Sequence, residues 1–171
     1  MSKLQLNVFK FKHHDVTCFS LYKYDENMKE FIYQLKGCYD IELGEIFLNS
    51  IIKELRLFFK GYTIVPIPSN ECDDEIREFN HVEQIFSYLK LPMLKILYKK
   101  EKYKQSDQKK TDRSNIKNIL KLSTLSNLKN QKILIVDDIF TTGSTLGVAI
   151  DLIKQLKPKD IKCLVVAKVE H

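Results

Sequence analysis

The sequence predicts an α/β fold in which a mostly parallel, twisted sheet is flanked by helices and preceded by a small N-terminal β-hairpin. Short apolar runs alternate with amphipathic segments along most of the chain, which is typical of parallel strands connected by helices. The clearest run, Ile133–Val136, is apolar at every position, as expected of a strand buried on both faces. With 171 residues the chain can bury a core of its own without disulfides or metal.

The N-terminal segment predicts the hairpin. Apolar residues partly alternate over residues 4–9 and 16–22, on either side of His13-His14-Asp15. We therefore divide the chain into a hairpin cap, residues 1–24, and an α/β domain, residues 25–171. No chemical role is expected for the two histidines of the turn.

The remaining elements follow from the same periodicities. Apolar residues spaced three and four apart predict helices over residues 28–35, 48–59, 79–89 and 149–156. Short apolar runs predict strands over residues 62–66, 94–98, 132–136 and 161–167. Strand and helix alternate in the second half of the chain, so we expect helices on both faces of the sheet.

A lysine-rich segment, residues 99–115, has no apolar periodicity. Loops of this length in a compact domain are usually functional or disordered, and we expect a mobile lid beside a ligand site. The lysines could face phosphate. A solvated loop in a lysine-rich protein of net charge +6 explains them equally well.

Cysteine usage and the N-terminal residues bear on location. The four cysteines, at positions 18, 38, 72 and 163, form no C-x-x-C pair, so we expect neither a zinc site nor a disulfide framework. The start Met-Ser-Lys-Leu-Gln-Leu lacks the apolar stretch of a signal peptide, and no apolar run approaches the ~20 residues of a membrane span. We expect a reduced, cytoplasmic protein.

Two acidic residues and a hydroxyl-rich turn follow the Ile133–Val136 strand. Asp137 and Asp138 come at its carboxyl end, where open α/β sheets bind their ligands, and both can accept hydrogen bonds from vicinal ribose hydroxyls. The turn then offers backbone N–H groups, hydroxyls and the positive end of a helix dipole, which suit a phosphate. Its residues are Thr141, Thr142, Gly143, Ser144 and Thr145. The segment predicts a site for a phosphorylated sugar.

Three other interpretations fit this segment less well. A receiver domain would need several more strand–helix units after the acidic strand, and too little chain follows. A P-loop nucleotidase would need the G-x-x-x-x-G-K-[ST] spacing, which the five glycines do not form. Simple helix caps would explain the hydroxyls but would leave the second acid without a role.

The turn after the first core strand is a second candidate for anion binding. Two prolines in Val65–Asn70 force an irregular turn that can present N–H groups to an anion, so Pro68 and Ser69 are candidate ligand contacts. Arg77 is a candidate anion contact as well. A salt bridge to Asp73 or Asp74 explains Arg77 equally well.

The acidic strand and its turn resemble the phosphoribosyl pyrophosphate (PRPP) motif of the type I phosphoribosyltransferases. Further blocks resemble the ComF-type competence proteins of that family over about residues 30–168. They are Leu35-Lys36-Gly37 with Asp40 and Leu43-Gly44-Glu45, the V-P-x-P turn Val65–Pro68, the box Arg77-Glu78-Phe79-Asn80-His81, and Gln105 with Arg113 and Asn115.

The resemblance implies a function. Mg²⁺-PRPP would lie across the carboxyl edge of the sheet, with its 5′-phosphate on the Thr141–Thr145 loop and its ribose hydroxyls on Asp137 and Asp138. The Mg²⁺ ion would be carried by PRPP, and a nitrogen nucleophile would take the phosphoribosyl group. The alternative is a non-catalytic protein of the same fold, which serves DNA uptake by binding single-stranded DNA or competence partners.

The chain departs from the pattern of these relatives in four places, one of which is that Asn115 follows Arg113 one residue too closely. The N-terminal zinc ribbon of longer members is absent, so we expect no metal there. In the box, Glu78 replaces the usual glycine and His81 the usual glutamine, and we expect His81 to be a surface or packing residue. Residues 71–75 carry four acids where relatives tend to be basic, and these would repel pyrophosphate unless Mg²⁺ or the lysine-rich segment intervenes.

Overall fold

The computed structural model describes residues 8–37, 48, 50–68, 80–99, 120–123 and 127–170. Its main element is a five-stranded sheet of order β1-β2-β7-β6-β3. The strands are β1 (Phe9–His13), β2 (Val16–Lys23), β3 (Tyr62–Pro66), β6 (Lys132–Phe140) and β7 (Asp160–Lys168). All neighbouring strands run parallel except β1, which pairs antiparallel with β2 at one edge. The predicted mostly parallel sheet is confirmed.

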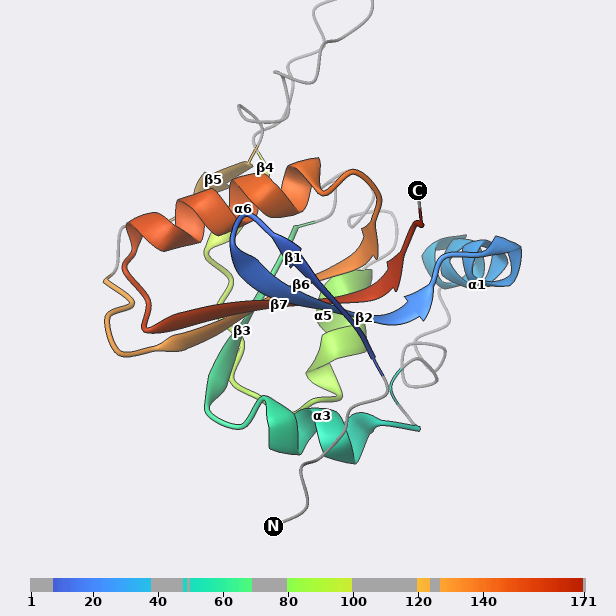
Figure 1. The fold of residues 1–171 in the computed structure, drawn as a ribbon, viewed down its shortest axis with the longest axis horizontal. Coiled ribbons are helices and arrows are strands. Elements are labelled where there is room, and N and C mark those ends of the chain that lie inside the picture. Colours follow the sequence, from blue (N-terminus) through green and yellow to red (C-terminus); the bar gives the residue numbers. More distant parts are fainter. Residues whose placement is uncertain are drawn as a thin grey trace, which may run out of the picture.

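Helices cover both faces of the sheet, as predicted (Figure 1). On one face α3 (Ile52–Phe58) and α5 (His81–Ser87) pack against the side chains of Leu134 and Val136 of β6. On the other face α6 (Ser144–Gln155) packs against Ile133 and Ile135. These four consecutive β6 side chains are fully buried, so β6 contributes core residues to both faces of the sheet.

The β6 strand is longer than its apolar run. The predicted strand ended at Val136, but β6 continues through both acids to Phe140. The physical reason is its partner: β7 pairs with β6 from Lys132 as far as Phe140. The two carboxyl groups therefore lie within a strand, and strand geometry fixes their directions.

The N-terminal hairpin is present and belongs to the main sheet. Its turn residues His14 and Asp15 have φ of 46° and 62°, as the tight two-residue turns of hairpins require. Strand β2 pairs in parallel with β7, with Cys18 opposite Cys163. Both hairpin strands therefore belong to the same sheet as β7, β6 and β3. Helix α1 (Glu26–Gly37) begins directly after the predicted boundary at residue 24.

The other edge of the sheet is covered. The segment after α5 runs along β3, where the Ile64 amide donates to Pro92 O at 2.7 Å and the Leu94 amide to Ile64 O at 2.8 Å. The strand predicted over residues 94–98 is shorter, as β4 (Leu97–Lys99), and pairs with β5 (Leu120–Leu122) in a small antiparallel ribbon. The lysine-rich segment lies between β4 and β5 and, apart from Lys99, outside the described residues.

None of the helices that the structure describes is long and apolar enough to cross a membrane.

Phe19 tests whether the hairpin folds with the rest of the chain. This β2 residue is 5% exposed, and its ring lies 5.3 Å from that of Phe58 and 5.7 Å from that of Phe59. We expect Phe19→Ala to lower the free energy of unfolding by about 3–5 kcal/mol in urea titrations, in a single transition. The control Phe9→Ala, at a side chain 46% exposed on β1, should change it by less than about 0.5 kcal/mol. An unchanged midpoint for Phe19→Ala, or a second transition, would show that the hairpin folds independently.

Candidate functional site

The connection from β6 to α6 turns sharply at Gly143. This residue is the N-cap of α6, with φ 74° and ψ 8°, and its carbonyl accepts the first helical hydrogen bond from the Gly147 amide at 2.7 Å. A Cβ at this position would lie 2.5 Å from Phe140 Cε2 and 2.6 Å from His13 Cε1. Only glycine satisfies both the backbone angle and the space.

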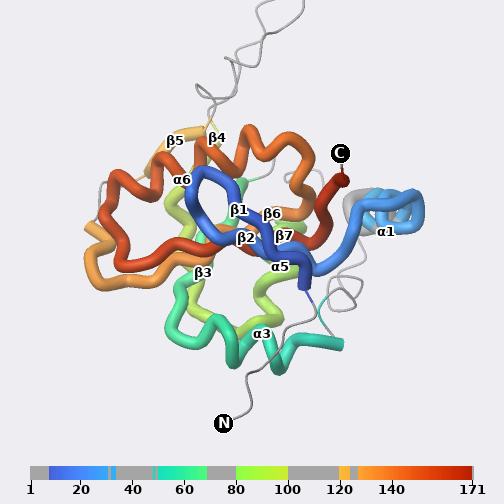
Figure 2. The backbone as a smooth tube through the Cα atoms, viewed as in Figure 1, coloured from blue at the N-terminus to red at the C-terminus, as the bar shows by residue number. Residues whose placement is uncertain are grey.

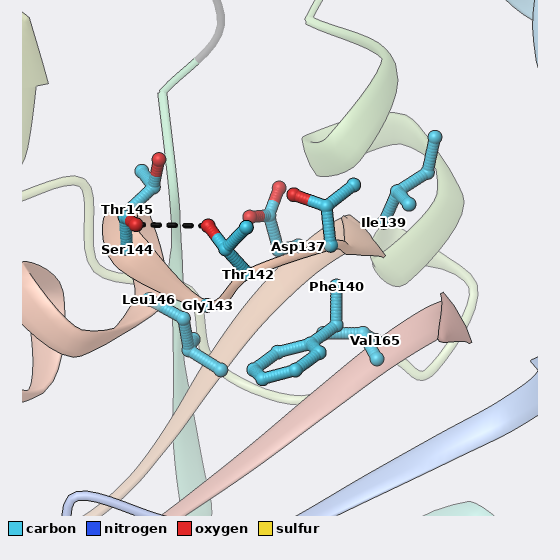
Figure 3. Close-up of a pocket in the computed structure, with 10 residues that line it drawn as sticks. Asp137, Ile139, Phe140, Thr142, Gly143, Ser144, Thr145, Leu146 and Val165 are labelled. Atoms are coloured by element: carbon cyan, nitrogen blue, oxygen red, sulfur yellow. Dashed lines mark hydrogen bonds between the residues drawn. The ribbon is translucent and has the colours of Figure 1, made fainter. Parts of the chain in front are cut away.

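A pocket of about 120 Å³ lies between the end of β6 and the start of α6 (Figure 3). The hydroxyls of Thr142 and Ser144 lie 2.8 Å apart on its rim. Figure 3 shows the Asp137 carboxyl group on the same side of the strand as these hydroxyls. The pocket is lined by Asp137, Ile139, Phe140, Thr141, Thr142, Gly143, Ser144, Thr145, Leu146 and Val165. The structure therefore brings Asp137 and the whole predicted loop together.

The two acids do not share this pocket. Successive side chains of a strand point to opposite faces, so Asp137 faces the α6 side and Asp138 the α5 side. Asp138 is 9% exposed, and its Oδ2 lies 2.9 Å from His81 Nε2. Its Oδ1 accepts a hydrogen bond from the Ile139 amide at 2.7 Å. We expected both carboxylates to bind the ribose hydroxyls. In the free protein only Asp137 lines the pocket, and Asp138 is bound to His81 on the other face.

His81 is a candidate functional residue that sequence reasoning placed among surface or packing residues. It is the first residue of α5, only 4% exposed, and the helix start is fixed by Asn80, whose side chain accepts from the Glu83 amide at 3.1 Å. A carboxylate can only accept, so Nε2 of His81 carries the proton in this pair. Within the described part of the chain, its other ring nitrogen is buried without a partner. The signal was available in the box, because glutamine and histidine share the ability to donate an N–H to a carboxylate.

The V-P-x-P turn lies beside the acids. Pro66 pairs with Val136 in the sheet, and the Ile67 amide donates to Val136 O at 2.9 Å. Pro68 is half-buried at the end of this turn and does not line the pocket. The other two predicted anion contacts, Ser69 and Arg77, lie outside the described residues, as do the acids of residues 71–75.

The environment of Asp137 disfavours its charged form. Burial, followed by the negative charge of Asp138, raises the pKa of Asp137 well above its ordinary value of 3.8. The backbone N–H of Asp138, which donates to Asp137 Oδ1 at 2.9 Å, and the Lys99 ammonium group act in the opposite direction. A positive charge that arrived at the pocket would relieve this electrostatic cost.

Comparisons with known proteins identify the family of the chain. The family model for the phosphoribosyl transferase domain matches residues 79–171, more than half of the chain. The chain belongs to the phosphoribosyl transferase domain family. The matched part contains α5, β6, α6 and β7, and with them the pocket and the His81–Asp138 pair.

Two competence proteins are similar to this chain. Competence protein ComFC of Streptococcus pneumoniae (strain ATCC BAA-255 / R6) is 28% identical over 143 residues, which are 84% of this chain and 64% of that protein. Competence protein ComFC of Bacillus subtilis (strain 168) is 30% identical over 132 residues, 76% of this chain and 55% of that protein. The predicted resemblance to ComF-type phosphoribosyltransferases is confirmed, and the chain spans less than two thirds of the length of either relative.

Among solved structures, the purine phosphoribosyltransferase from Pyrococcus horikoshii Ot3 superposes with a TM-score of 0.47 at 22% identity, covering 73% of each chain.

Replacing Asp137 should make stability depend differently on pH. A carboxyl group with a raised pKa favours the folded state while it is protonated, so this contribution is complete below about 3.8 and is lost as the pH rises toward the raised value. Asparagine has no such dependence and can still accept the Asp138 N–H. We expect Asp137→Asn to be more stable than wild type at neutral pH, with an advantage that shrinks toward acid. Thermal unfolding from about pH 4 to about pH 8 measures it, and a pH-independent difference would contradict the electrostatic argument.

Two glycine substitutions separate backbone strain from crowding at the loop. Gly61 has φ 83° and nothing within 4 Å of an added Cβ, so Gly61→Ala should cost only the strain, about 1–2 kcal/mol of unfolding free energy. Gly143→Ala should cost about 1–3 kcal/mol more, because the Phe140 ring and His13 crowd the new methyl group. Urea unfolding of both variants gives the comparison. Equal costs would mean that the loop yields freely at Gly143.

Proposed function

We propose that this chain binds Mg²⁺-PRPP, or a closely related phosphorylated ribose, in the pocket between β6 and α6. The observation that carries the proposal is that Asp137 and all five residues of the Thr141–Thr145 loop line one pocket. Membership of the phosphoribosyl transferase domain family supports the same class of ligand.

The loop is suited to the 5′-phosphate. The first amides of a helix have no acceptor within the helix, and Gly143, as N-cap, has no side chain to offer them one. An anion at this end also meets the positive end of the α6 dipole. The hydroxyls of Thr142 and Ser144 are bonded to each other at the rim, so one of them donates to the other and the second can donate to a ligand. This set of donors selects a phosphate over a neutral group.

Asp137 is suited to the ribose. Its carboxylate can accept hydrogen bonds from ribose hydroxyls, in the same pocket as the phosphate donors. When the bond between the anomeric carbon and pyrophosphate breaks, positive charge develops on the sugar ring. Burial and the charge of Asp138 destabilise the anionic form of Asp137. The anion therefore stabilises the positively charged sugar of the transition state more than it stabilises the neutral sugar of the ground state. A nitrogen nucleophile then forms its bond to the anomeric carbon.

Asp138 and His81 act from the other face of β6. The imidazole holds one oxygen of the Asp138 carboxylate at 2.9 Å and the Ile139 amide holds the other at 2.7 Å. The negative charge of this carboxylate lies next to Asp137 in sequence and raises the pKa of Asp137. We propose that it contributes mainly through that charge, with His81 as the residue that positions it.

The described residues fit a Mg²⁺ ion that arrives with its substrate. Mg²⁺ prefers oxygen ligands and is usually bound through one or two carboxylates together with substrate phosphates and water. Among the described residues, no three His, Cys, Asp or Glu side chains gather to hold a metal. Asp137 is the carboxylate that the pocket offers to such an ion. When bound, the ion would neutralise charge on the departing pyrophosphate.

Calorimetric titration with Mg²⁺-PRPP tests the proposal. Wild type should bind at one site, and Asp137→Asn should weaken the affinity by about 10- to 100-fold, the value of a charge-assisted hydrogen bond. Asp138→Asn alone should cost less, and the double variant should show no measurable binding while keeping its fold by circular dichroism. Unchanged affinity in the double variant would refute the assignment of the ribose site.

A role in competence, in the cytoplasm, forms the second part of the proposal. Its support is the similarity to the two ComFC competence proteins, together with free thiols at Cys18 and Cys163 that suit a reducing compartment. The net charge of +6 favours an alternative in which the protein binds single-stranded DNA without turnover. Titration with an oligonucleotide at several salt concentrations, beside the titration with Mg²⁺-PRPP, separates DNA binding from PRPP binding. Salt-dependent binding of DNA without any binding of PRPP would favour the alternative.

A further inference from the structure

The tip of the N-terminal hairpin lies against the start of α6, far from it in sequence. Figures 1 and 2 show the turn between β1 and β2 beside this helix. Gly143 and Gly147, four residues apart and so on one face of the chain as it enters the helix, form the seat. A Cβ on Gly143 would lie 2.6 Å from His13 Cε1, and one on Gly147 would lie 2.8 Å from His14 Nε2. The two imidazoles fill the space that the two glycines leave.

His13 makes a directed contact at the phosphate loop. Its Nε2 lies 2.9 Å from the carbonyl oxygen of Gly143, and a carbonyl only accepts, so Nε2 is the donor. The same carbonyl accepts the Gly147 amide at 2.7 Å. Two donors on one oxygen fix the orientation of the Gly143–Ser144 peptide unit.

That peptide unit also carries the Ser144 amide. In a trans peptide the C=O and N–H bonds point in opposite directions. Because the Gly143 carbonyl points along α6 toward Gly147, the Ser144 N–H points out of the helix start, where Ser144 lines the pocket. His13 therefore holds the carbonyl end of a peptide unit whose N–H end faces the ligand. Its hydrogen bond to the carbonyl also polarises the N–H of the same unit.

Ring contacts extend this support to the pocket wall. The His13 ring lies 5.2 Å from the Phe140 ring at an interplanar angle of 84°. The ring of Phe11, which is also on the hairpin, lies 4.8 Å from the Phe140 ring. Phe140 is itself part of the pocket lining. The hairpin thus supports both a wall and a backbone donor of the site.

The adjacent His14 anchors the tip farther along the helix. Its Nδ1 lies 3.0 Å from Asp151 Oδ1, and Lys154 donates to its backbone carbonyl at 2.9 Å. The side chains of His14 and Asp151 are 42% and 54% exposed, so their pairing adds little stability. Among the described residues, the His14 ring bonds to Asp151 on α6 and not to the Gly143 carbonyl, which makes His14 a matched control for His13.

We propose that His13 is a positioning residue of the phosphate loop, and that the N-terminal hairpin is thereby a working part of the ligand site. The inference rests on the proposed binding of a phosphorylated ribose. The His13 Nε2–H sets the orientation of the Gly143–Ser144 peptide unit. The N–H of this unit can then donate to the 5′-phosphate without rearrangement. His13 itself does not contact the ligand.

Three variants separate the hydrogen bond from packing. His13→Phe keeps a ring but removes the donor, His13→Gln keeps a donor near the position of Nε2, and His14→Phe alters the tip without touching the loop carbonyl. Calorimetry with Mg²⁺-PRPP and with ribose 5-phosphate should show about tenfold weaker binding for His13→Phe. His13→Gln should regain most of the affinity, and His14→Phe should bind as wild type does.

Hydrogen exchange of the Gly147 amide supplies a second readout, because this amide reports the bond to the Gly143 carbonyl in the free protein. It should exchange several-fold faster in His13→Phe and unchanged in His14→Phe. Wild-type affinity and exchange in His13→Phe, or equal losses in both phenylalanine variants, would overturn the inference while the proposed function stands. Failure of wild type to bind either ligand would instead refute the proposed function, and this inference with it.

Discussion

The alternation of side chains along β6 is the constraint on which the rest of the structure depends. This strand pairs with β3 on one side and β7 on the other, and its four apolar residues are fully buried between α6 on one face and α3 and α5 on the other. Because β7 keeps the pairing in register beyond Val136, the alternation continues into the two acids. Asp137 is thereby assigned to the face where α6 begins, and Asp138 to the face where α5 begins.

This assignment gives two adjacent carboxyl groups different chemistry. Asp138 is held by His81 and by a backbone amide, whereas Asp137 lines a pocket with its charged form disfavoured. The arrangement resembles a common strategy in which a permanent charge raises the pKa of its neighbour, so that the neighbour favours a cationic ligand or transition state. The disfavoured charge on Asp137 lowers the stability of the free protein. A positive charge bound at the site would restore that stability.

Much of the fold could be predicted from the sequence, because its signals are local. Apolar periodicity indicated the hairpin, the parallel sheet and the helix after Gly143, and the motif of acids followed by hydroxyls located the pocket. The contacts that refine the site could not be predicted in this way. His13 meets Gly143 across 130 residues, and His81 meets Asp138 across 57, so neither pairing leaves a trace in local spacing. The apolar run of β6 likewise ends at Val136, although the strand continues where its neighbour pairs with it.

The central claim is that the end of β6 and the start of α6 together hold a phosphorylated ribose, and a crystal structure of the protein with ribose 5-phosphate tests it most directly. We expect the phosphate within hydrogen-bonding distance of the Ser144 and Thr145 amides and a ribose hydroxyl on the carboxylate of Asp137. The hairpin should remain seated on Gly143. A phosphate bound away from the Thr141–Thr145 loop, or a sugar that leaves Asp137 without a contact, would contradict the account.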